Sequence, residues 1–459
     1  MPIATVNPTT GERVRSFDEE TPDVVERKLA AAGAAWKRWR NEPASRRAAV
    51  VARAGELLQS EKRGFGQLMT LEMGKLIGAA QDEAAKCATA CQYYAERAEA
   101  FLKPEVVSSS GSGRDEIQFH PLGPVLAVMP WNFPFWQVIR FAAPALVAGN
   151  VGLLKHASNV PQCALALEDL FRRAGAPEGV FQTLLVGSAP IETLIADDRV
   201  AAVTVTGSEA AGRAIAAAAG KNLKKSVLEL GGSDPFLVLA SADLDRAVAT
   251  AVKARIVNNT GQSCIAAKRF IVADAVYDRF TEAFTRAMAA LVVGDPADPR
   301  TQVGPLATAS IRDGVADQVE RSVRAGARLA TGGHVIDRPG FFYEPTVLAE
   351  VPPDAPAARE EVFGPAAAVL RVRDTGAAIA LANDSDFGLG AAAFTRDRAE
   401  AERLGRELEA GSVFINGMVA SDPRFPFGGV KRSGYGRELS LHGMREFQNV
   451  KTVRIAELP

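Results

Sequence analysis

Cysteine is scarce in this chain, with four residues among 459. So few cysteines exclude a disulfide framework and favour a reducing compartment. No apolar stretch of about 18 residues runs free of proline and charge, so the sequence predicts no membrane-spanning helix. The first residues lack a basic segment followed by an apolar one, which argues against a secretory signal. We therefore expect a cytoplasmic protein.

An excess of charge of either sign is also lacking, because 53 Lys and Arg balance 54 Asp and Glu to give a net charge of -1. This balance gives no electrostatic reason to expect a nucleic acid or a membrane as partner. The four histidines lie far apart, and no Cys/His pair has metal-ligand spacing, so no metal site is predicted. At roughly 150 residues per domain, the length allows two or three domains.

The hydrophobic pattern predicts an α/β fold. Residues 1–15 look like a polar, turn-rich start, and helices are expected from Pro22, over about 45–60 and over about 80–103. Short apolar runs then alternate with helical stretches. Strands are expected at 125–129, 151–155, 180–186, 202–205 and 227–230, and helices at 137–147, 160–174, 189–196 and 208–219. Such alternation predicts a parallel sheet covered on both faces, and a second alternating region spans about 235–425.

Two polar residues stand out against this pattern. Cys264 ends the segment Asn-Thr-Gly-Gln-Ser-Cys at 259–264, whereas a structural cysteine usually lies in an apolar run. Taken alone, a buried and inert thiol remains the simpler interpretation. Glu229 ends an apolar strand, where open α/β sheets bind their ligands and where burying a carboxylate is costly. A salt-bridged strand end is the alternative for Glu229.

Two turns after predicted strands could bind a ligand. In Pro-Trp-Asn-Phe-Pro at 130–134, the amide of Asn132 could donate to an oxyanion, although aromatic turns more often serve packing. In Thr-Gly-Ser at 206–208, a strand end, a tight turn and a helix start could hold a phosphate. No G-x-G-x-x-G motif follows a strand, so an ordinary Rossmann domain lacks its usual signature.

Together, these motifs resemble those of the aldehyde dehydrogenase superfamily along nearly the whole chain. They occur in the family's order and at similar spacings: PWNFP at 130–134, LLKHAS at 153–158, TGSEAAG at 206–212, LELGG at 228–232, NTGQSC at 259–264, EEVFGP at 360–365 and PFGGVKRSGYGRE at 426–438. That family binds its dinucleotide without G-x-G-x-x-G, which accounts for the missing motif. The resemblance implies two α/β open-sheet domains and a small oligomerisation hairpin.

The resemblance also implies a domain division and an assembly. The dinucleotide-binding domain would comprise 1–109 and 124–231, and the catalytic domain 232–425. Residues 110–123, as a protruding hairpin, and 440–459, with a strand at about 446–456, would carry oligomerisation. A homodimer or homotetramer is expected.

Catalytic roles follow from the same resemblance. Cys264 matches the nucleophile that attacks the aldehyde carbon as a thiolate. Asn132 and the backbone N–H of Cys264 match the oxyanion hole. Glu229 matches the general base that activates water to hydrolyse the thioester.

The cofactor site is implied in the same way. Lys155 and Glu361 match the residues that hold the two riboses. Ser158 stands where NAD-preferring members often carry an acidic residue, whose charge would repel a 2′-phosphate by roughly 4 kcal/mol at close range. We therefore expect a preference for NADP, with NAD also used. The other expected cofactor contacts are Trp131, Asn132, His156, Ala157, Gly207, Ser208, Leu230 and Phe363. The two aromatic residues among them, Trp131 and Phe363, could equally serve core packing.

Segments 130–146 and 153–167 most resemble those of bacterial succinate-semialdehyde dehydrogenases. In those enzymes an arginine at the position of Arg140 binds the distal carboxylate, and Ser421 is a second candidate for this contact. A structural salt bridge is the alternative for Arg140. Some relatives have another arginine where this chain has Asn258, and Arg255 or Arg424 are candidates to replace it.

The resemblance thus implies NAD(P)-dependent oxidation of succinate semialdehyde to succinate. The first alternative is the same chemistry on another small aliphatic aldehyde or semialdehyde. A CoA-acylating enzyme is less consistent, because Glu229 would then have little purpose as a base for water. A non-catalytic protein on this scaffold would not need Cys264, Glu229, Asn132 and Lys155 together.

Overall fold

The structure is a computed structural model, and it describes residues 3–110, 113–257 and 259–456. Its N-terminal part differs from expectation in two places. Residues 1–15, predicted as turns, contain β1 (Ile3–Val6) and most of β2 (Arg13–Phe17), which pair as a small antiparallel sheet. The helical region holds one helix more than predicted, α3. Its helices are α1 (Pro22–Trp39), α2 (Ala44–Ser60), α3 (Lys62–Met73) and α4 (Ile77–Leu102).

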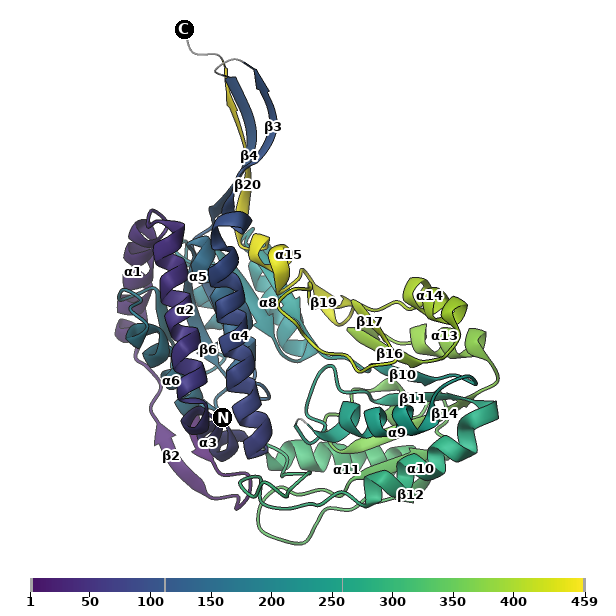
Figure 1. Cartoon of the computed structure of the whole chain (residues 1–459). Helices are drawn as coiled ribbons and strands as arrows, with labels where there is room; N and C mark the ends of the chain where they lie inside the picture. The colour runs from purple at the N-terminus through teal and green to yellow at the C-terminus, as the bar shows by residue number, and fades with distance from the viewer. Residues whose placement is uncertain (1–2, 111–112, 258, 457–459) are drawn as a thin grey trace.

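The first large sheet has six strands, all parallel except the edge strand β19. Helices α2, α4, α5 and α6 pack together beside it (Figure 1). At the edge opposite β19, the strand β7 is shorter than the predicted 180–186, since it pairs with a single neighbour over three residues. In spatial order the strands are β19 (Gly434–Tyr435), β9 (Lys225–Glu229), β8 (Ala202–Thr206), β5 (Pro124–Met129), β6 (Val151–His156) and β7 (Phe181–Thr183). The helices that connect them are α5 (Trp136–Ala148), α6 (Pro161–Arg173), α7 (Ile191–Ala196) and α8 (Glu209–Lys221).

The strand order of this sheet reverses direction at β5. The chain proceeds outward from β5 to β6 and β7, then returns to the other side of β5 to form β8 and β9. The connections after β5 and β8 therefore leave in opposite directions. In open α/β sheets, the crevice at such a switch point is where ligands bind.

The second large sheet has seven strands, and of these only β12 is antiparallel to its neighbour. The predicted α/β class with two open sheets is confirmed. In order the strands are β12 (Arg328–Thr331), β13 (Thr346–Ala349), β14 (Ala366–Val372), β11 (Arg269–Ala273), β10 (Pro235–Val238), β16 (Gly390–Phe394) and β17 (Ser412–Ile415). Its helices are α9 (Leu244–Val252), α10 (Tyr277–Ala289), α11 (Ala309–Arg324), α12 (Pro356–Arg359), α13 (Thr375–Asn383) and α14 (Arg398–Glu407). The short strands β15 (Phe387–Gly388) and β18 (Val430–Lys431) pair with each other, and the short helix α15 (Ser440–Arg445) packs against α5.

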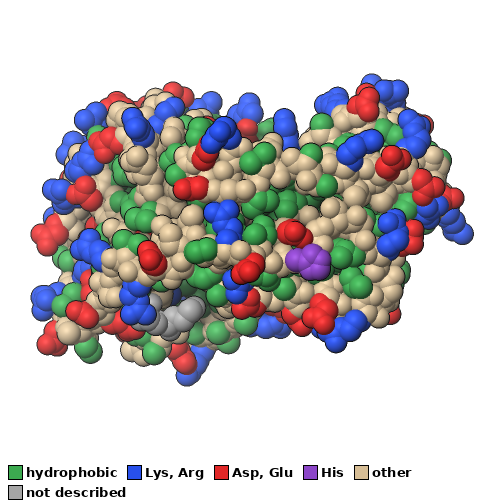
Figure 2. All heavy atoms as spheres, turned by 90° about the horizontal axis from the view of Figure 1, so that it is seen from below, with side chains coloured by type: hydrophobic (Ala, Val, Ile, Leu, Met, Phe, Trp, Pro, Cys, Tyr) green, Lys and Arg blue, Asp and Glu red, His purple; other side chains and the backbone are tan. Residues whose placement is uncertain are grey.

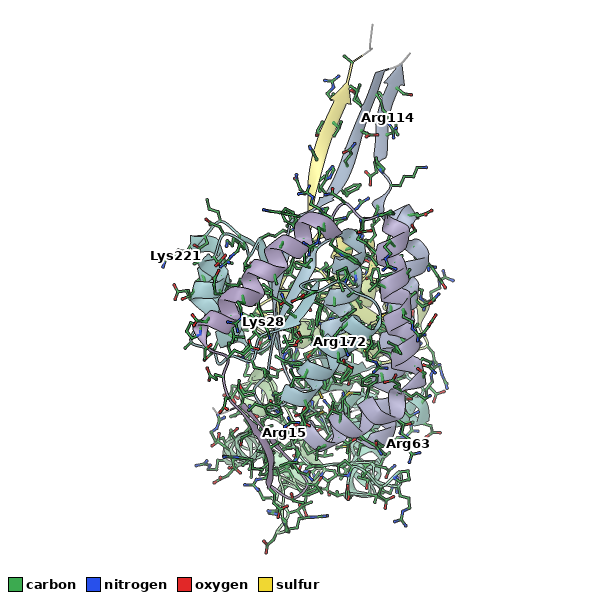
Figure 3. The ribbon with its side chains drawn as sticks, turned by 90° about the vertical axis from the view of Figure 1, so that its left-hand side faces the viewer. Arg15, Lys28, Arg63, Arg114, Arg172 and Lys221 are labelled. Carbon is green, nitrogen blue, oxygen red and sulfur yellow. The ribbon has the colours of Figure 1, made fainter. Side chains whose placement is uncertain are left out.

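A three-stranded antiparallel sheet projects from the body of the molecule (Figure 1). It joins β3 (Glu105–Ser110), β4 (Gly113–Pro121) and the C-terminal strand β20 (Gln448–Ile455). The hairpin thus begins earlier than the expected residue 110, and the late strand lies where it was predicted. Arg114 lies on this sheet, well away from the body (Figure 3).

Two properties of the surface bear on the expected partners. In the described part of the chain, no helix is long and apolar enough to cross a membrane. On the face turned away from the projecting sheet, Lys and Arg side chains are interspersed with Asp and Glu (Figure 2). This mixture matches the near-zero net charge of the sequence.

Candidate active site

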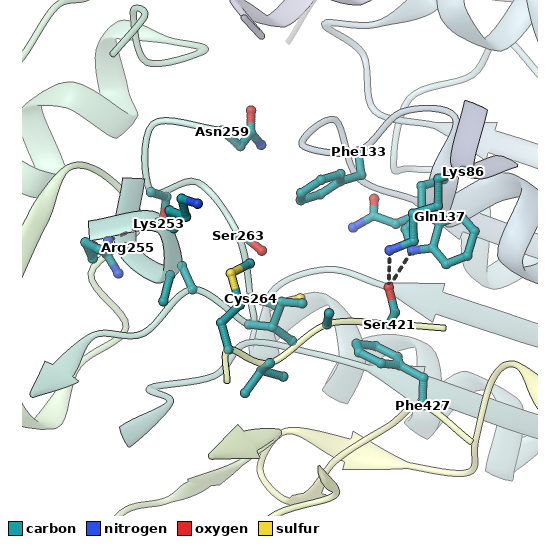
Figure 4. A pocket seen from close by; sticks show the side chains of 18 of the residues that line it. Lys86, Phe133, Gln137, Lys253, Arg255, Asn259, Ser263, Cys264, Ser421 and Phe427 are labelled. Carbon is teal, nitrogen blue, oxygen red and sulfur yellow. Dashed lines mark hydrogen bonds between the residues drawn. The ribbon is translucent and has the colours of Figure 1, made fainter. Parts of the chain in front are cut away.

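Cys264 lies where two cavities meet. It is partly exposed on the loop between the π-helix Lys253–Val257 and β11, and it lines both cavities. We call the first the α4-side cavity, whose lining includes Lys86, Phe133, Trp136, Gln137, Arg140, Ser421 and Phe427 (Figure 4). We call the second the switch-point cavity, whose lining includes Trp131, Asn132, Thr206, Gly207, Ser208, Leu230, Glu361 and Phe363.

Lys268 fixes the loop that carries Cys264. The buried Nζ of Lys268 donates to the carbonyl oxygens of Ser263, Cys264 and Ala266 at 2.8–3.0 Å. It also lies 3.7 Å from Oε1 of Glu361. A single ammonium thus ties the thiol-bearing loop to a carboxylate of the switch-point cavity. The sequence interpretation missed Lys268, whose only signal was a lysine directly before an apolar strand.

Asn132 belongs to the turn after β5 and is fixed against the same loop. Its Nδ2 donates to the carbonyl of Gln262 at 3.0 Å, and its Oδ1 accepts from Nε2 of Gln137 at 3.0 Å. Nδ2 of Asn259 donates to the Asn132 carbonyl at 2.7 Å. Two loops that are far apart in sequence are therefore locked together, and the amide of Asn132 is held in one orientation beside Cys264.

A buried ion pair between Lys75, in the connection before α4, and Glu83 on α4 supports this turn from the other side. Lys75 and Glu83 pair with almost no exposure, and Nζ of Lys75 donates to the Asn132 carbonyl at 3.0 Å. Glu83 Oε1 accepts the backbone N–H groups of Phe135 and Trp136, each at 2.9 Å. The sequence analysis did not predict this role for Lys75 and Glu83. A helical pattern in the sequence does not show which turn of the chain will pack against the helix.

The surroundings of Cys264 favour a protonated thiol in this structure. Burial raises the pKa of Cys264 to about 12, while Arg140 and Lys268 act weakly in the opposite direction. Within the described residues, the backbone N–H of Cys264 has no hydrogen-bond acceptor. Together with the second N–H of the Asn132 amide, this group can donate to an oxygen that develops negative charge on an attacked carbonyl.

The switch-point cavity has the features of a dinucleotide site. It is lined by the turns that follow β5 and β8, and Ser208 caps the start of α8 by accepting from the Ala211 N–H at 3.3 Å. Free N–H groups at a helix start favour a phosphate. Glu361 Oε1 accepts the Gly232 N–H at 3.0 Å and so presents a carboxylate that can bind ribose hydroxyls.

Two aromatic rings shape one wall of this cavity. Trp131 and Phe363 meet edge to face, with ring centroids 5.8 Å apart and an interplanar angle of 88°. Both residues line the cavity, as do Gly207, Ser208 and Leu230. These predicted cofactor contacts are therefore brought together, which sequence spacing alone could not establish.

The predicted contacts that follow β6 lie outside this lining. They are Lys155, His156, Ala157 and Ser158, at or just beyond the carboxyl end of the strand next to β5. His156 is buried, with Nε2 2.9 Å from the Pro134 carbonyl, and burial lowers its pKa to about 4. Its neutral ring holds the 130–134 turn in place. The cofactor role of these four residues stays a prediction.

Glu229 is not part of either cavity's lining. It is buried at the end of β9, and neither carboxyl oxygen has a hydrogen-bond partner among the described residues. Burial raises the pKa of Glu229 well above its usual range, opposed by the nearby charge of Arg140. In this structure the carboxyl group is packed against Gly428 rather than turned toward Cys264.

Arg140 and Ser421 both line the α4-side cavity. Arg140 is buried and forms an ion pair with the equally buried Glu438, and its Nη2 donates to Thr206 at 3.2 Å. The carboxylate of Glu438 therefore balances the guanidinium charge. Ser421 Oγ accepts from Nε1 of Trp136 at 3.0 Å and from Nζ of Lys86 at 2.7 Å, as the dashed lines in Figure 4 show.

The arginines considered as replacements at position 258 have other partners. Position 258 itself lies outside the described residues. Arg255 is buried and donates to the carbonyls of Ala267, Gly261, Val362 and Gly364. Arg424 is largely exposed and pairs with Asp422 at 2.6 Å. The sequence interpretation missed two further cations of this cavity, Lys86 and Lys253. Lys86 lies among the many charged residues of the long helix α4.

Comparison with known proteins agrees with this geometry. Residues 1–453 match the Aldehyde dehydrogenase family. The chain is 55% identical over 458 residues to "Succinate-semialdehyde dehydrogenase [NADP(+)] 1" of Mycobacterium tuberculosis, with 99% of this chain and 100% of that protein covered. It is 54% identical to "Succinate-semialdehyde dehydrogenase [NADP(+)]" of Mycobacterium leprae, with the same coverage.

A solved structure gives the same result. The succinic semialdehyde dehydrogenase of Streptococcus pyogenes in complex with NADP+ superposes with a TM-score of 0.96 at 39% identity, covering 99% of this chain and 100% of the other. The chain belongs to the aldehyde dehydrogenase family.

Proposed function

We propose that the protein oxidises succinate semialdehyde to succinate with NADP+ as its preferred cofactor. The observation that carries this function is the position of Cys264, which opens both to the switch-point cavity and to the α4-side cavity. A thiol placed there can contact a substrate from one side and a hydride acceptor from the other. The names of the relatives from Mycobacterium and Streptococcus support the choice of substrate and cofactor.

The first chemical step is loss of the Cys264 Sγ proton to solvent, after which the thiolate attacks the aldehyde carbon. A carbon–sulfur bond forms and the carbonyl electron pair moves onto oxygen, giving a thiohemiacetal oxyanion. The Asn132 amide and the Cys264 backbone N–H donate to this oxygen, and losing one such donor typically costs about 10²–10³ in rate. NADP+, held by the residues of the switch-point cavity, would accept the hydride from the thiohemiacetal carbon, and Cys264 would then hold the acyl group as a thioester.

Hydrolysis of the thioester needs a base, and we assign this role to Glu229. Its raised pKa gives the carboxylate the proton affinity that a general base for water requires. To act, the Glu229 side chain has to turn from its place beside Gly428 toward Cys264. Water then adds to the thioester carbon, the carbon–sulfur bond breaks, and the acid leaves with the thiol regenerated.

We assign the preference for NADP+ to the residues at the end of β6 and directly after it. Lys155 is a cation at the carboxyl end of β6, and Ser158, three residues later, adds a hydroxyl and no negative charge. A 2′-phosphate would therefore meet the positive charge of Lys155 and no acidic side chain at position 158. This arrangement supports NADP+ as the better cofactor, with NAD+ also used.

The projecting sheet supports a homo-oligomer, either a dimer or a tetramer. Its strands leave apolar side chains exposed, with exposed fractions of 53% for Val106, 68% for Val107 and 61% for Val450. An extended sheet that buries little of its own apolar surface gains stability when a second copy covers it. The oligomeric state is measurable by light scattering of the purified protein.

Initial rates with the purified protein test the function. We expect reduced cofactor to appear with succinate semialdehyde, faster with NADP+ than with NAD+, and no reaction in Cys264→Ala. Butanal, which has the same carbon chain without a carboxylate, serves as the neutral comparison. Faster oxidation of butanal than of the semialdehyde would favour the alternative, the same chemistry on another small aldehyde.

A further inference from the structure

We propose that Lys86, acting with Ser421, binds the distal carboxylate of the substrate and so determines specificity for a semialdehyde acid. This inference rests on the proposed function and adds a residue to it. Lys86 lies on α4, far from the cysteine loop in sequence, and its side chain reaches into the α4-side cavity that Cys264 also lines. Figure 4 shows Lys86 and Ser421 gathered on one side of this cavity.

The hydrogen bonds around Ser421 leave donors for an anion. Its Oγ accepts from Lys86 Nζ at 2.7 Å and from Trp136 Nε1 at 3.0 Å. A hydroxyl oxygen has two acceptor positions, and both are occupied, so its own hydrogen has to be donated elsewhere. The Lys86 ammonium has three donors and gives one of them to Ser421. Both groups are therefore left with hydrogens to donate.

The positive charge of Lys86 has no carboxylate partner among the described residues. Two acidic side chains that are close enough to act on this charge have other partners, since Glu83 pairs with Lys75 and Asp422 pairs with Arg424. Lys86 Nζ instead lies 4.2 Å from the centre of the Trp136 ring, a cation–π contact. Burial lowers the pKa of Lys86 only to about 8, so the side chain is mostly charged at neutral pH.

Each of the other cations that line this cavity has an ion-pair partner, donates to backbone carbonyls or is exposed to solvent. Arg140 forms its buried ion pair with Glu438, which makes that pair neutral as a unit. Arg255 donates to backbone carbonyls behind the cysteine loop. Lys253 is exposed at the rim, where water screens its charge. Lys86 is thus the partly buried cation of this lining whose charge an incoming carboxylate can still neutralise.

This placement selects substrates by length as well as by charge. The aldehyde has to reach Cys264 while the carboxylate reaches Lys86 and Ser421, so both ends of the molecule are fixed within one cavity. Trp136 and Phe133 supply apolar surface for the methylene groups in between. The chemistry recognised is a short aliphatic chain with an aldehyde at one end and a carboxylate at the other.

The test compares kcat/KM for succinate semialdehyde with kcat/KM for butanal in wild type and Lys86→Met. Methionine keeps an unbranched apolar chain only one atom shorter than lysine but removes the charge and the donors. A charged hydrogen bond of ordinary strength predicts that the ratio of the two values falls roughly 10- to 150-fold. We expect Lys86→Arg to keep most of the ratio and Lys253→Met, which removes the exposed rim cation, to leave the ratio within about twofold of wild type.

An unchanged ratio in a folded Lys86→Met would overturn the assignment. A large fall in the double variant Arg140→Gln/Glu438→Gln alone would instead assign the carboxylate to Arg140. If Lys86→Met does not fold, Ser421→Ala gives the second test, with a smaller fall in the same ratio expected and no fall contradicting the proposal. A wild-type enzyme that does not oxidise succinate semialdehyde would refute the proposed function itself, which is a separate outcome.

Discussion

Gly231 leaves the space that the Glu361 carboxylate occupies. A Cβ atom at position 231 would overlap with Oε2 of Glu361, whose other oxygen accepts the Gly232 N–H at 3.0 Å. Gly231 therefore allows close packing against a carboxylate that lines the switch-point cavity. Gly232 has a different neighbour, because a Cβ atom there would lie 2.9 Å from the carbonyl oxygen of Cys264.

Gly231→Ala should displace the Glu361 side chain while leaving the fold intact, because the clash involves the flexible end of a side chain. We expect the Kd for NADP+ to rise roughly tenfold, the cost of one charged hydrogen bond. Titration of intrinsic fluorescence with NADP+ measures the effect. Glu361→Gln serves as the matched control, and a Kd unchanged in both variants would contradict the role given to Glu361.

Ser158→Glu should reverse the cofactor preference. A carboxylate at this position would repel the 2′-phosphate by roughly 4 kcal/mol at close range, before screening by salt reduces the effect. We expect a strongly raised KM for NADP+ and a nearly unchanged KM for NAD+. Ser158→Ala separates the loss of the hydroxyl from the gain of charge. A ratio of the two KM values that stays at its wild-type level would refute the assignment.

The reactivity of Cys264 should depend steeply on pH in the absence of cofactor. Burial raises its pKa to about 12, so the thiol is protonated at neutral pH and the reactive thiolate fraction grows as pH rises. We expect the rate of alkylation by iodoacetamide to increase about tenfold per pH unit between about pH 7 and about pH 9. Peptide mass spectrometry locates the label.

The three other cysteines provide the internal comparison for this labelling. Cys87, Cys91 and Cys163 have no exposed surface, so they should remain unlabelled while the protein is folded. A labelling rate at Cys264 that is already constant below about pH 8 would show a low pKa and contradict the prediction. Repeating the measurement with NADP+ bound would show how far the cofactor itself changes the thiol.

Lys75→Met should damage both stability and catalysis. Removing one partner leaves Glu83 buried without its counter-ion, which typically costs about 3–5 kcal/mol. It also removes one of the two donors to the Asn132 carbonyl and leaves only Asn259, so kcat should fall as well. Urea unfolding and initial rates measure the two effects.

The double variant Lys75→Met/Glu83→Gln separates these effects. It removes the unpaired charge, so most of the stability should return. The support for the 130–134 turn is still lost, so kcat should remain low. Full recovery of kcat in the double variant would show that the pair does not position Asn132.

Much of this protein is determined by local sequence. The alternation of apolar runs with helical stretches predicted the α/β class, and the strand at 125–129 and the helix at 137–147 were predicted to within a residue at each end. The cysteine motif and the turn at 130–134 were recognisable because glycine, proline and polar residues interrupt the apolar pattern there. The period of the hydrophobic pattern and the residue types of a turn are local properties, so both can be recognised without knowledge of the fold.

Only the tertiary structure determines which groups the residues of the site contact. Only the folded chain shows that Glu438 balances Arg140, that Lys75 and Glu83 carry the Asn132 turn, and that Lys86 reaches Ser421 from 335 residues away. The partners come from different sheets and helices, so no spacing in the sequence encodes their approach. Whether a charge is neutralised or free to bind a ligand depends on these long-range contacts, because burial and partner together set its electrostatic energy.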